Sequence, residues 1–91
     1  MCPILHYFLR NYFHQDWMID SSSSEMVVKK FVSSESAEMI TGLRNDIEVV
    51  LALESVSDSL VYDWGGNYSP KVDGLSTRAW LESVRVWLER E

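Results

Sequence analysis

Apolar residues recur at helical spacing in the first part of the chain. In residues 3–15 they form one stripe, which holds Ile4, Leu5, Phe8, Leu9, Tyr12 and Phe13. Polar residues, including His6 and Arg10, occupy the opposite side. This spacing is typical of an amphipathic helix that packs on a core. Pro3 suits the first turn, where a missing backbone N–H leaves no bond unmade. We therefore predict a first helix over residues 3–15.

The same periodicity predicts four more helices. Ser22 with Glu25, and Ser55 with Asp58, have the spacing of capping boxes, which start helices. The pair Gly65-Gly66 stops the fourth helix. The predicted helices are a short one around residues 27–32, a longer one over about 36–53, a short one over 55–64 and a last one that begins at Ser76 or Thr77.

These elements predict the fold class. No segment alternates apolar and polar residues between turns as a strand would, so we predict an all-α fold. The short connections favour an antiparallel bundle of about five helices. The length of 91 residues favours a single small domain over residues 1–91.

Two features interrupt the helical pattern. Gly42 lies inside the long predicted helix, where it costs about 1 kcal/mol relative to alanine. It predicts either the close approach of another helix or a local bend. Residues 65–74 are rich in glycine, asparagine and proline, which are turn formers, and we predict an irregular loop there.

The charge of the chain favours a protein partner. Fourteen acidic and eight basic residues give a net charge of −6. The chain lacks the basic stripe that phosphate contacts require, because Lys29-Lys30 is only a pair, and this argues against direct binding of nucleic acid. An acidic surface would steer the approach of a basic protein. The alternative is that the charge only keeps a small domain in solution.

The sequence offers no motif for catalysis, a metal or a cofactor. Cys2 has no base beside it, and His6 and His14 stand about two helical turns apart, too far to share one ion. No serine lies in a nucleophile elbow, and Gly65-Gly66 lacks the spacing of a phosphate-binding loop. We therefore expect a protein that is not an enzyme and that carries no cofactor. With no signal-peptide pattern and no long apolar run, we expect it in the cytoplasm, away from the membrane.

Aromatic residues beside acids suggest a binding surface. Trp17, Trp64 and Tyr68 fall at predicted helix ends or in loops, next to acidic residues. Rings with adjacent acids would suit a site for a basic protein. The candidate partner-binding residues are Asp16, Trp17, Asp58, Asp63, Trp64, Tyr68 and Asp73. The alternative is that the rings close the ends of a small core.

One hexapeptide has no simple period and resembles a family motif. Tyr12-Phe13-His14-Gln15-Asp16-Trp17 follows the first helix and is similar to a motif of the immunity proteins of contact-dependent growth inhibition systems. Tyr68-Ser69-Pro70, then Gly74, then Trp80-Leu81 resemble that family's C-terminal pattern. The resemblance covers nearly the whole chain, although residues 21–60 match only as generic helices. The run of four serines at residues 21–24 departs from the family pattern.

The resemblance implies a function that the residues alone do not give. Proteins of this family are small, cytoplasmic and non-enzymatic. Each binds the C-terminal toxin domain of a large effector delivered by a neighbouring bacterium, and the toxins are often nucleases. The resemblance therefore implies a 1:1 complex with a cognate toxin domain, and a basic nuclease would be a fitting partner. It also implies that the chain inhibits the toxin by blocking its active site or substrate surface.

We expect the shared hexapeptide to stabilise the fold rather than to contact the toxin. A motif common to proteins that each recognise a different toxin cannot be what discriminates among toxins, because specificity needs contacts that differ. We therefore expect residues 12–17 to join the first helix to the rest, with His14 as a capping or hydrogen-bonded core histidine. Two other hypotheses remain: an adaptor unrelated to a toxin, and a small hydrolase built on His14 and Asp16.

Overall fold

The computed structural model describes residues 2–90, which contain six α-helices and one 3-10 helix and no strand. The elements are α1 (Pro3–Tyr12), α2 (Trp17–Asp20), α3 (Ser24–Ser34), α4 (Ala37–Leu51), α5 (Leu60–Asp63), η1 (Pro70–Asp73) and α6 (Thr77–Arg90). The prediction of an all-α fold is confirmed. The elements α2 and η1 were not predicted, because a single helical turn is too short to leave a periodic pattern in the sequence.

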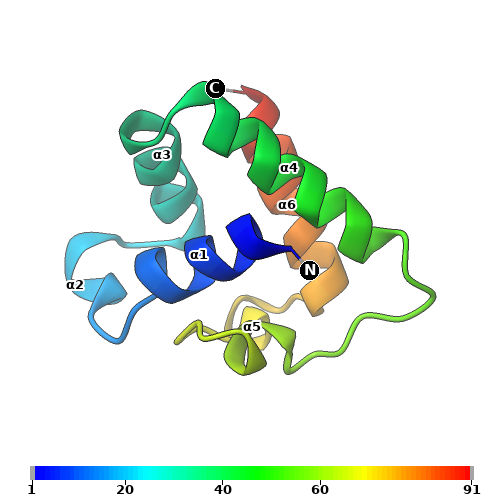
Figure 1. Ribbon diagram of the computed structural model, residues 1–91. Helices are drawn as coiled ribbons and strands as arrows, with labels where there is room; N and C mark the ends of the chain where they lie inside the picture. The colour runs from blue at the N-terminus through cyan, green and yellow to red at the C-terminus, as the bar shows by residue number, and fades with distance from the viewer. Residues whose placement is uncertain (1, 91) are drawn as a thin grey trace.

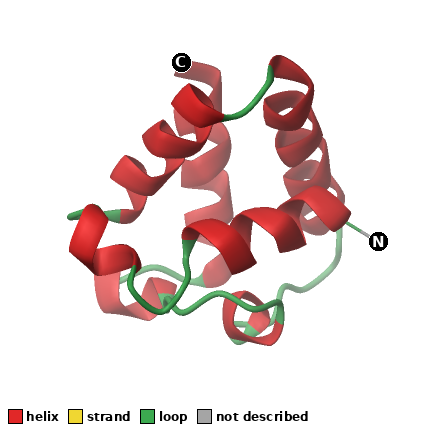
Figure 2. Cartoon of the chain, turned by 60° about the vertical axis from the view of Figure 1, so that its left-hand side comes forward, coloured by secondary structure: helices red, strands yellow, loops and turns green. Residues whose placement is uncertain are grey.

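The longer helices form two levels. Helices α4 and α6 lie side by side and run in opposite directions, and α3 packs on the other flank of α6 (Figure 1). Helix α1 lies across this group and packs mainly on α4 (Figures 1 and 2). Helix α2 stands at the outer edge of the molecule, beyond the end of α1 (Figure 1).

Several predicted helix boundaries were wrong, and hydrogen bonds explain the differences. Helix α1 ends at Tyr12 rather than residue 15, with Phe13 as its C-cap. The N-cap of α3 is Ser23, whose hydroxyl accepts a bond from the N–H of Met26, rather than Ser22. Asp58 does not start a helix with Ser55. Its carboxylate instead accepts the N–H of Thr77 at 3.3 Å, which caps α6.

Other start signals were correct. The hydroxyl of Ser36 accepts the N–H of Met39 at 3.2 Å, and α4 begins there as predicted. The hydroxyl of Ser76 accepts the N–H of Ala79 at 3.1 Å, so Ser76 supports the first turn of α6. A side-chain oxygen that accepts an otherwise unpaired N–H of the first turn stabilises a helix start.

Helices α1 and α4 approach each other closely, and a side chain of α4 caps the start of α1. A Cβ atom on Gly42 would meet Cδ1 of Ile4, so the glycine lets the two helices approach closely. This confirms the first of the two explanations for Gly42. One carboxylate oxygen of Asp46 accepts the N–H groups of Ile4 at 2.9 Å and Leu5 at 3.0 Å. A side chain of α4 therefore satisfies the first turn of α1, where negative charge is favoured.

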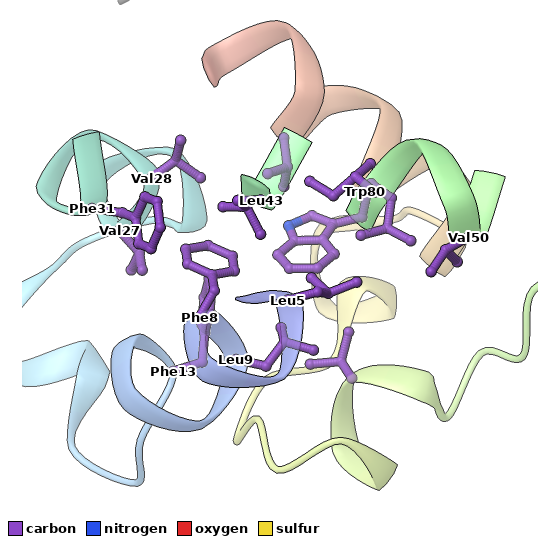
Figure 3. Packing of buried hydrophobic residues seen from close by; sticks show 14 of the residues in the cluster. Leu5, Phe8, Leu9, Phe13, Val27, Val28, Phe31, Leu43, Val50 and Trp80 are labelled. Carbon is purple, nitrogen blue, oxygen red and sulfur yellow. The ribbon is translucent and has the colours of Figure 1, made fainter. Parts of the chain in front are cut away.

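The core contains a cluster of aromatic rings, and Phe13 lies at the centre of that cluster. The rings of Phe8, Trp17, Tyr68 and Trp80 surround it, with centroids 5.2 to 5.6 Å from its own. Most pairs meet edge to face, the geometry that aromatic quadrupoles favour. Figure 3 shows Phe8, Leu43 and Trp80 inside the shell of helices. Within the hexapeptide, the buried Phe13 and Trp17 join α1 to the rest of the chain, as expected, whereas residues 14–16 are exposed.

We expect Phe13→Ala to destabilise the protein by about 3 to 5 kcal/mol, because it removes a fully buried ring and leaves a cavity among four others. The unfolding free energy is measured by urea denaturation followed by circular dichroism. Tyr62→Ala is the control, since Tyr62 is 77% exposed, and it should change stability by less than about 0.5 kcal/mol. Equal losses for the two variants would contradict a central role for Phe13.

Candidate protein-binding surface

Two hydrogen bonds bring α2 and the segment before η1 together. The N–H of Asn67 donates to the carbonyl oxygen of Phe13 at 2.7 Å. The indole N–H of Trp17 donates to the carbonyl oxygen of Asn67 at 2.8 Å. The ring of Tyr68 then lies edge to face against Trp17, with centroids 5.5 Å apart. Residues fifty positions apart therefore form one surface.

A hollow of about 340 Å³ lies between α2, the start of α3 and η1. Its lining includes the rings of Trp17 and Tyr68, the side chains of Met18 and Val72, and Asp73. We call it the α2–η1 hollow. It combines an aromatic and apolar lining with a few polar groups, which is typical of binding sites.

Several exposed apolar residues on α2 and η1 were not predicted from the sequence. Met18, Ile19 and Val72 are among the most exposed hydrophobic residues, at 72%, 80% and 81%. They lie on α2 and η1, the two elements that periodicity did not predict. The only signal in the sequence was that Met18 and Ile19 prolong an apolar run after Trp17 outside any helical stripe.

A second hollow of about 310 Å³ lies on the other side of α2, against α1 and α3. Trp17 and Ser21 line both hollows, so α2 forms a ridge between them. Near the second hollow, the hydroxyls of Tyr7 and Tyr12 donate to the same oxygen of Glu35, at 2.8 and 2.5 Å. Burial first, and then the bond to Glu35, raise the pKa of Tyr12. Both phenols therefore act as hydrogen-bond donors to one carboxylate.

Four of the seven candidate residues are Asp16, Trp17, Tyr68 and Asp73. They lie on what we call the α2–η1 surface, which is the hollow together with the parts of α2 and η1 around it. Asp16 is the exposed N-cap of α2. Trp17 is only 8% exposed, and its indole N–H is already bonded, so it forms the floor rather than the rim. The hydroxyl of Tyr68 donates to Asp73 at 2.6 Å. Burial, with this bond as a second cause, raises the pKa of Tyr68.

The other three candidates lie on a separate surface around α5. Asp58 caps α6, and Asp63 accepts a bond from the hydroxyl of Ser59 at 2.8 Å. The ring of Trp64 stacks on His6 of α1, with centroids 4.1 Å apart. We call Asp58, Asp63 and Trp64 the α5 surface. The seven candidates therefore form two groups rather than one.

His14 has a structural role. Its side chain is exposed, and Nδ1 accepts the backbone N–H of Asp16 at 3.1 Å, while its carbonyl oxygen accepts the N–H of Trp17. His14 is hydrogen-bonded, as predicted, but it is exposed rather than part of the core, and its ring bonds to the residue that precedes α2 rather than to the first turn of that helix. The Nδ1 atom is engaged with the backbone of Asp16 rather than with its carboxylate.

Among residues 2–90, no group of three or more histidine, cysteine, aspartate or glutamate side chains is placed to hold a metal ion. No helix there has the length and apolar content to cross a bilayer.

Comparison with known proteins gives one family and one fold. The model of the CdiI immunity protein family matches residues 1–88. A crystal structure of a CdiA-CT/CdiI complex from Y. kristensenii 33638 contains a chain with a TM-score of 0.86 to this one and 24% sequence identity. The match covers 94% of this chain and 96% of that chain. At this identity the likeness shows a shared fold. A search of curated proteins gives no match.

The raised pKa of Tyr68 predicts a loss of stability at alkaline pH. An unfolded tyrosine ionises near pH 10. The folded state binds the phenol proton more tightly, so the free energy of unfolding should fall as pH rises above about 10. Tyr68→Phe keeps the ring and should weaken this decline. Tyr7 and Tyr12, whose pKa values are also raised, would account for what remains.

Urea denaturation at pH 7 and at several values between pH 10 and 11 would measure this effect. The comparison is between the slopes of wild type and Tyr68→Phe, because the loss of the bond to Asp73 shifts stability at every pH below the transition. Identical slopes would show that the Tyr68 proton is not linked to folding.

Proposed function

We propose that this chain, which belongs to the CdiI immunity protein family, binds and neutralises the toxin domain of its cognate contact-dependent growth inhibition effector. The observation that carries the proposal is the match of the family model over residues 1–88. The fold shared with a chain from a CdiA-CT/CdiI complex supports it. The protein would act in the cytoplasm as a non-catalytic inhibitor, in a 1:1 complex.

The charge of the chain supports a basic partner, of which a nuclease toxin is the natural example. A nuclease attracts phosphates with positive charge at its substrate surface. A protein with a net charge of −6 would be drawn to the same surface, and a bound inhibitor there would exclude the nucleic acid. We propose this occlusion as the mechanism of inhibition.

The α2–η1 surface is the better of the two candidate contact surfaces. It combines the exposed acids Asp16 and Asp73 with a hollow that has rings in its lining. An aromatic hollow can exclude water from a partner's side chain, and acids beside it attract basic groups. On the α5 surface, Asp58 holds the start of α6 and Trp64 stacks on His6, so these groups also serve the fold. We place the α5 surface at the margin of the contact.

The direct test uses the cognate toxin domain, which we expect the gene immediately upstream to encode. Co-expressed and purified, the two proteins should elute together from size-exclusion chromatography with the mass of a 1:1 complex. Cells that express the toxin domain should survive when this chain is present. A toxin domain from an unrelated effector is the control and should not be bound. A folded chain that neither binds nor protects would refute the proposal and favour the adaptor hypothesis.

Charge neutralisation should slow association, and more at the α2–η1 surface than at the α5 surface. The first double variant is Asp16→Asn with Asp73→Asn, and the matched control is Asp58→Asn with Asp63→Asn. Loss of steering charges should lower the association rate of the first variant about tenfold or less and weaken its salt dependence, while dissociation changes little.

Surface plasmon resonance at two salt concentrations would measure both rates. Thermal denaturation of each variant is needed alongside, because Asp73 binds Tyr68 and Asp58 caps α6. A larger loss in the Asp58 and Asp63 variant, with stability unchanged, would move the contact to the α5 surface.

A further inference from the structure

Helix α2 is a short element held in place from inside. It has only four residues, too few to be stable as an isolated helix. Trp17 fixes it, because the indole contacts Phe13 and Tyr68 and its N–H is bonded to Asn67. The N–H groups of Trp17 and Ile19 bond to the carbonyl oxygens of His14 and Asp16, each at 3.0 Å. Residues of the shared hexapeptide therefore help to fix the α2 ridge in one conformation before any partner binds.

The outer face of this ridge is apolar. Met18 and Ile19 follow Trp17 directly and expose most of their side chains to solvent. Single exposed hydrophobic residues are common and need no explanation. Here, however, Met18 and Val72 line the same hollow, and Ile19, which lines neither hollow, is 80% exposed on the same short helix. Apolar groups gathered around an aromatic floor form the kind of centre that dominates interface energy.

We propose that Met18 and Ile19 are the specificity-determining anchor for the toxin domain, which rests on the function proposed above. The α2 ridge would insert these two side chains into an apolar recess of the toxin domain. An apolar side chain of the toxin domain would fill the α2–η1 hollow, in contact with Tyr68 and Val72. The two anchor residues lie just outside the shared hexapeptide, so they can differ between family members without disturbing the core.

The charges beside the ridge identify the occupant as a partner with basic groups rather than a second copy of this chain. Asp16 and Asp20 begin and end α2, and Asp73 borders the hollow. Lys30 lies 3.6 Å from Asp20 and offsets part of this charge, and Lys71 is exposed on η1. Two copies meeting through this surface would bring Asp16 and Asp73 of both together, in chains that each carry a net charge of −6. Repulsion disfavours that pairing, whereas lysine or arginine beside an apolar side chain would fit.

Serine substitutions test the anchor without disturbing the core. The variants are Met18→Ser, Ile19→Ser, Val72→Ser and the double variant of Met18 and Ile19. The probe is the same cognate toxin domain as in the test of the proposed function. Each single variant should weaken its binding by about tenfold, and the double variant by about a hundredfold or more, chiefly through faster dissociation. Val86→Ser is the control, since it removes an exposed apolar side chain from α6 that belongs to neither candidate contact surface.

The outcomes separate the anchor from the function on which it rests. Isothermal titration calorimetry gives the affinities, and thermal denaturation should show melting temperatures within a few degrees of wild type, because the side chains are exposed. If wild type binds and protects but the double variant of Met18 and Ile19 binds as tightly, the anchor is refuted and the function stands. If the wild-type chain does not bind the toxin domain, the proposed function is refuted, and the proposed anchor with it. Concentration-dependent self-association that the double variant abolishes would also overturn the anchor, in favour of a second copy.

Discussion

The packing of four rings around Phe13 is the interaction on which the rest of the structure depends. Phe13 follows the last residue of α1, and its neighbours come from α1, α2, the segment before η1, and α6. One buried side chain therefore joins segments that are distant in the sequence. Its backbone adds a second link, because its carbonyl oxygen accepts the N–H of Asn67. Burial of large rings contributes much of the stability of a small domain, and edge-to-face contacts add to it.

The candidate binding surface is a consequence of this packing. The rings that surround Phe13 from the outside, Trp17 and Tyr68, form the lining of the α2–η1 hollow. The same residues thus close the core and shape the surface above it, so the two interpretations of the aromatic residues are not exclusive. A scaffold shared by a family can in this way present side chains that differ, because Met18 and Ile19 are exposed outside the core.

Some of the acidic residues hold the starts of helices, and others have no such role. Asp46 and Asp58 accept backbone N–H groups at the starts of α1 and α6, where a carboxylate is favoured by the unpaired donors and by the helix dipole. Asp16 and Asp20 are exposed at the two ends of α2. A net charge of −6 is therefore not a measure of binding surface, because some of it stabilises the fold.

The sequence by itself determined the helical class, the four longer helices and the family. Amphipathic periodicity is a local property that persists over several turns, so α1, α3, α4 and α6 were found, and Ser36 and Ser76 marked true starts. Only the tertiary structure decided where Asp58 bonds, what approaches Gly42, and that α2 and η1 meet. Those outcomes depend on contacts between residues far apart in the chain. A one-turn helix such as α2 exists because the indole of Trp17 is buried against rings from elsewhere, and no local pattern records that partner.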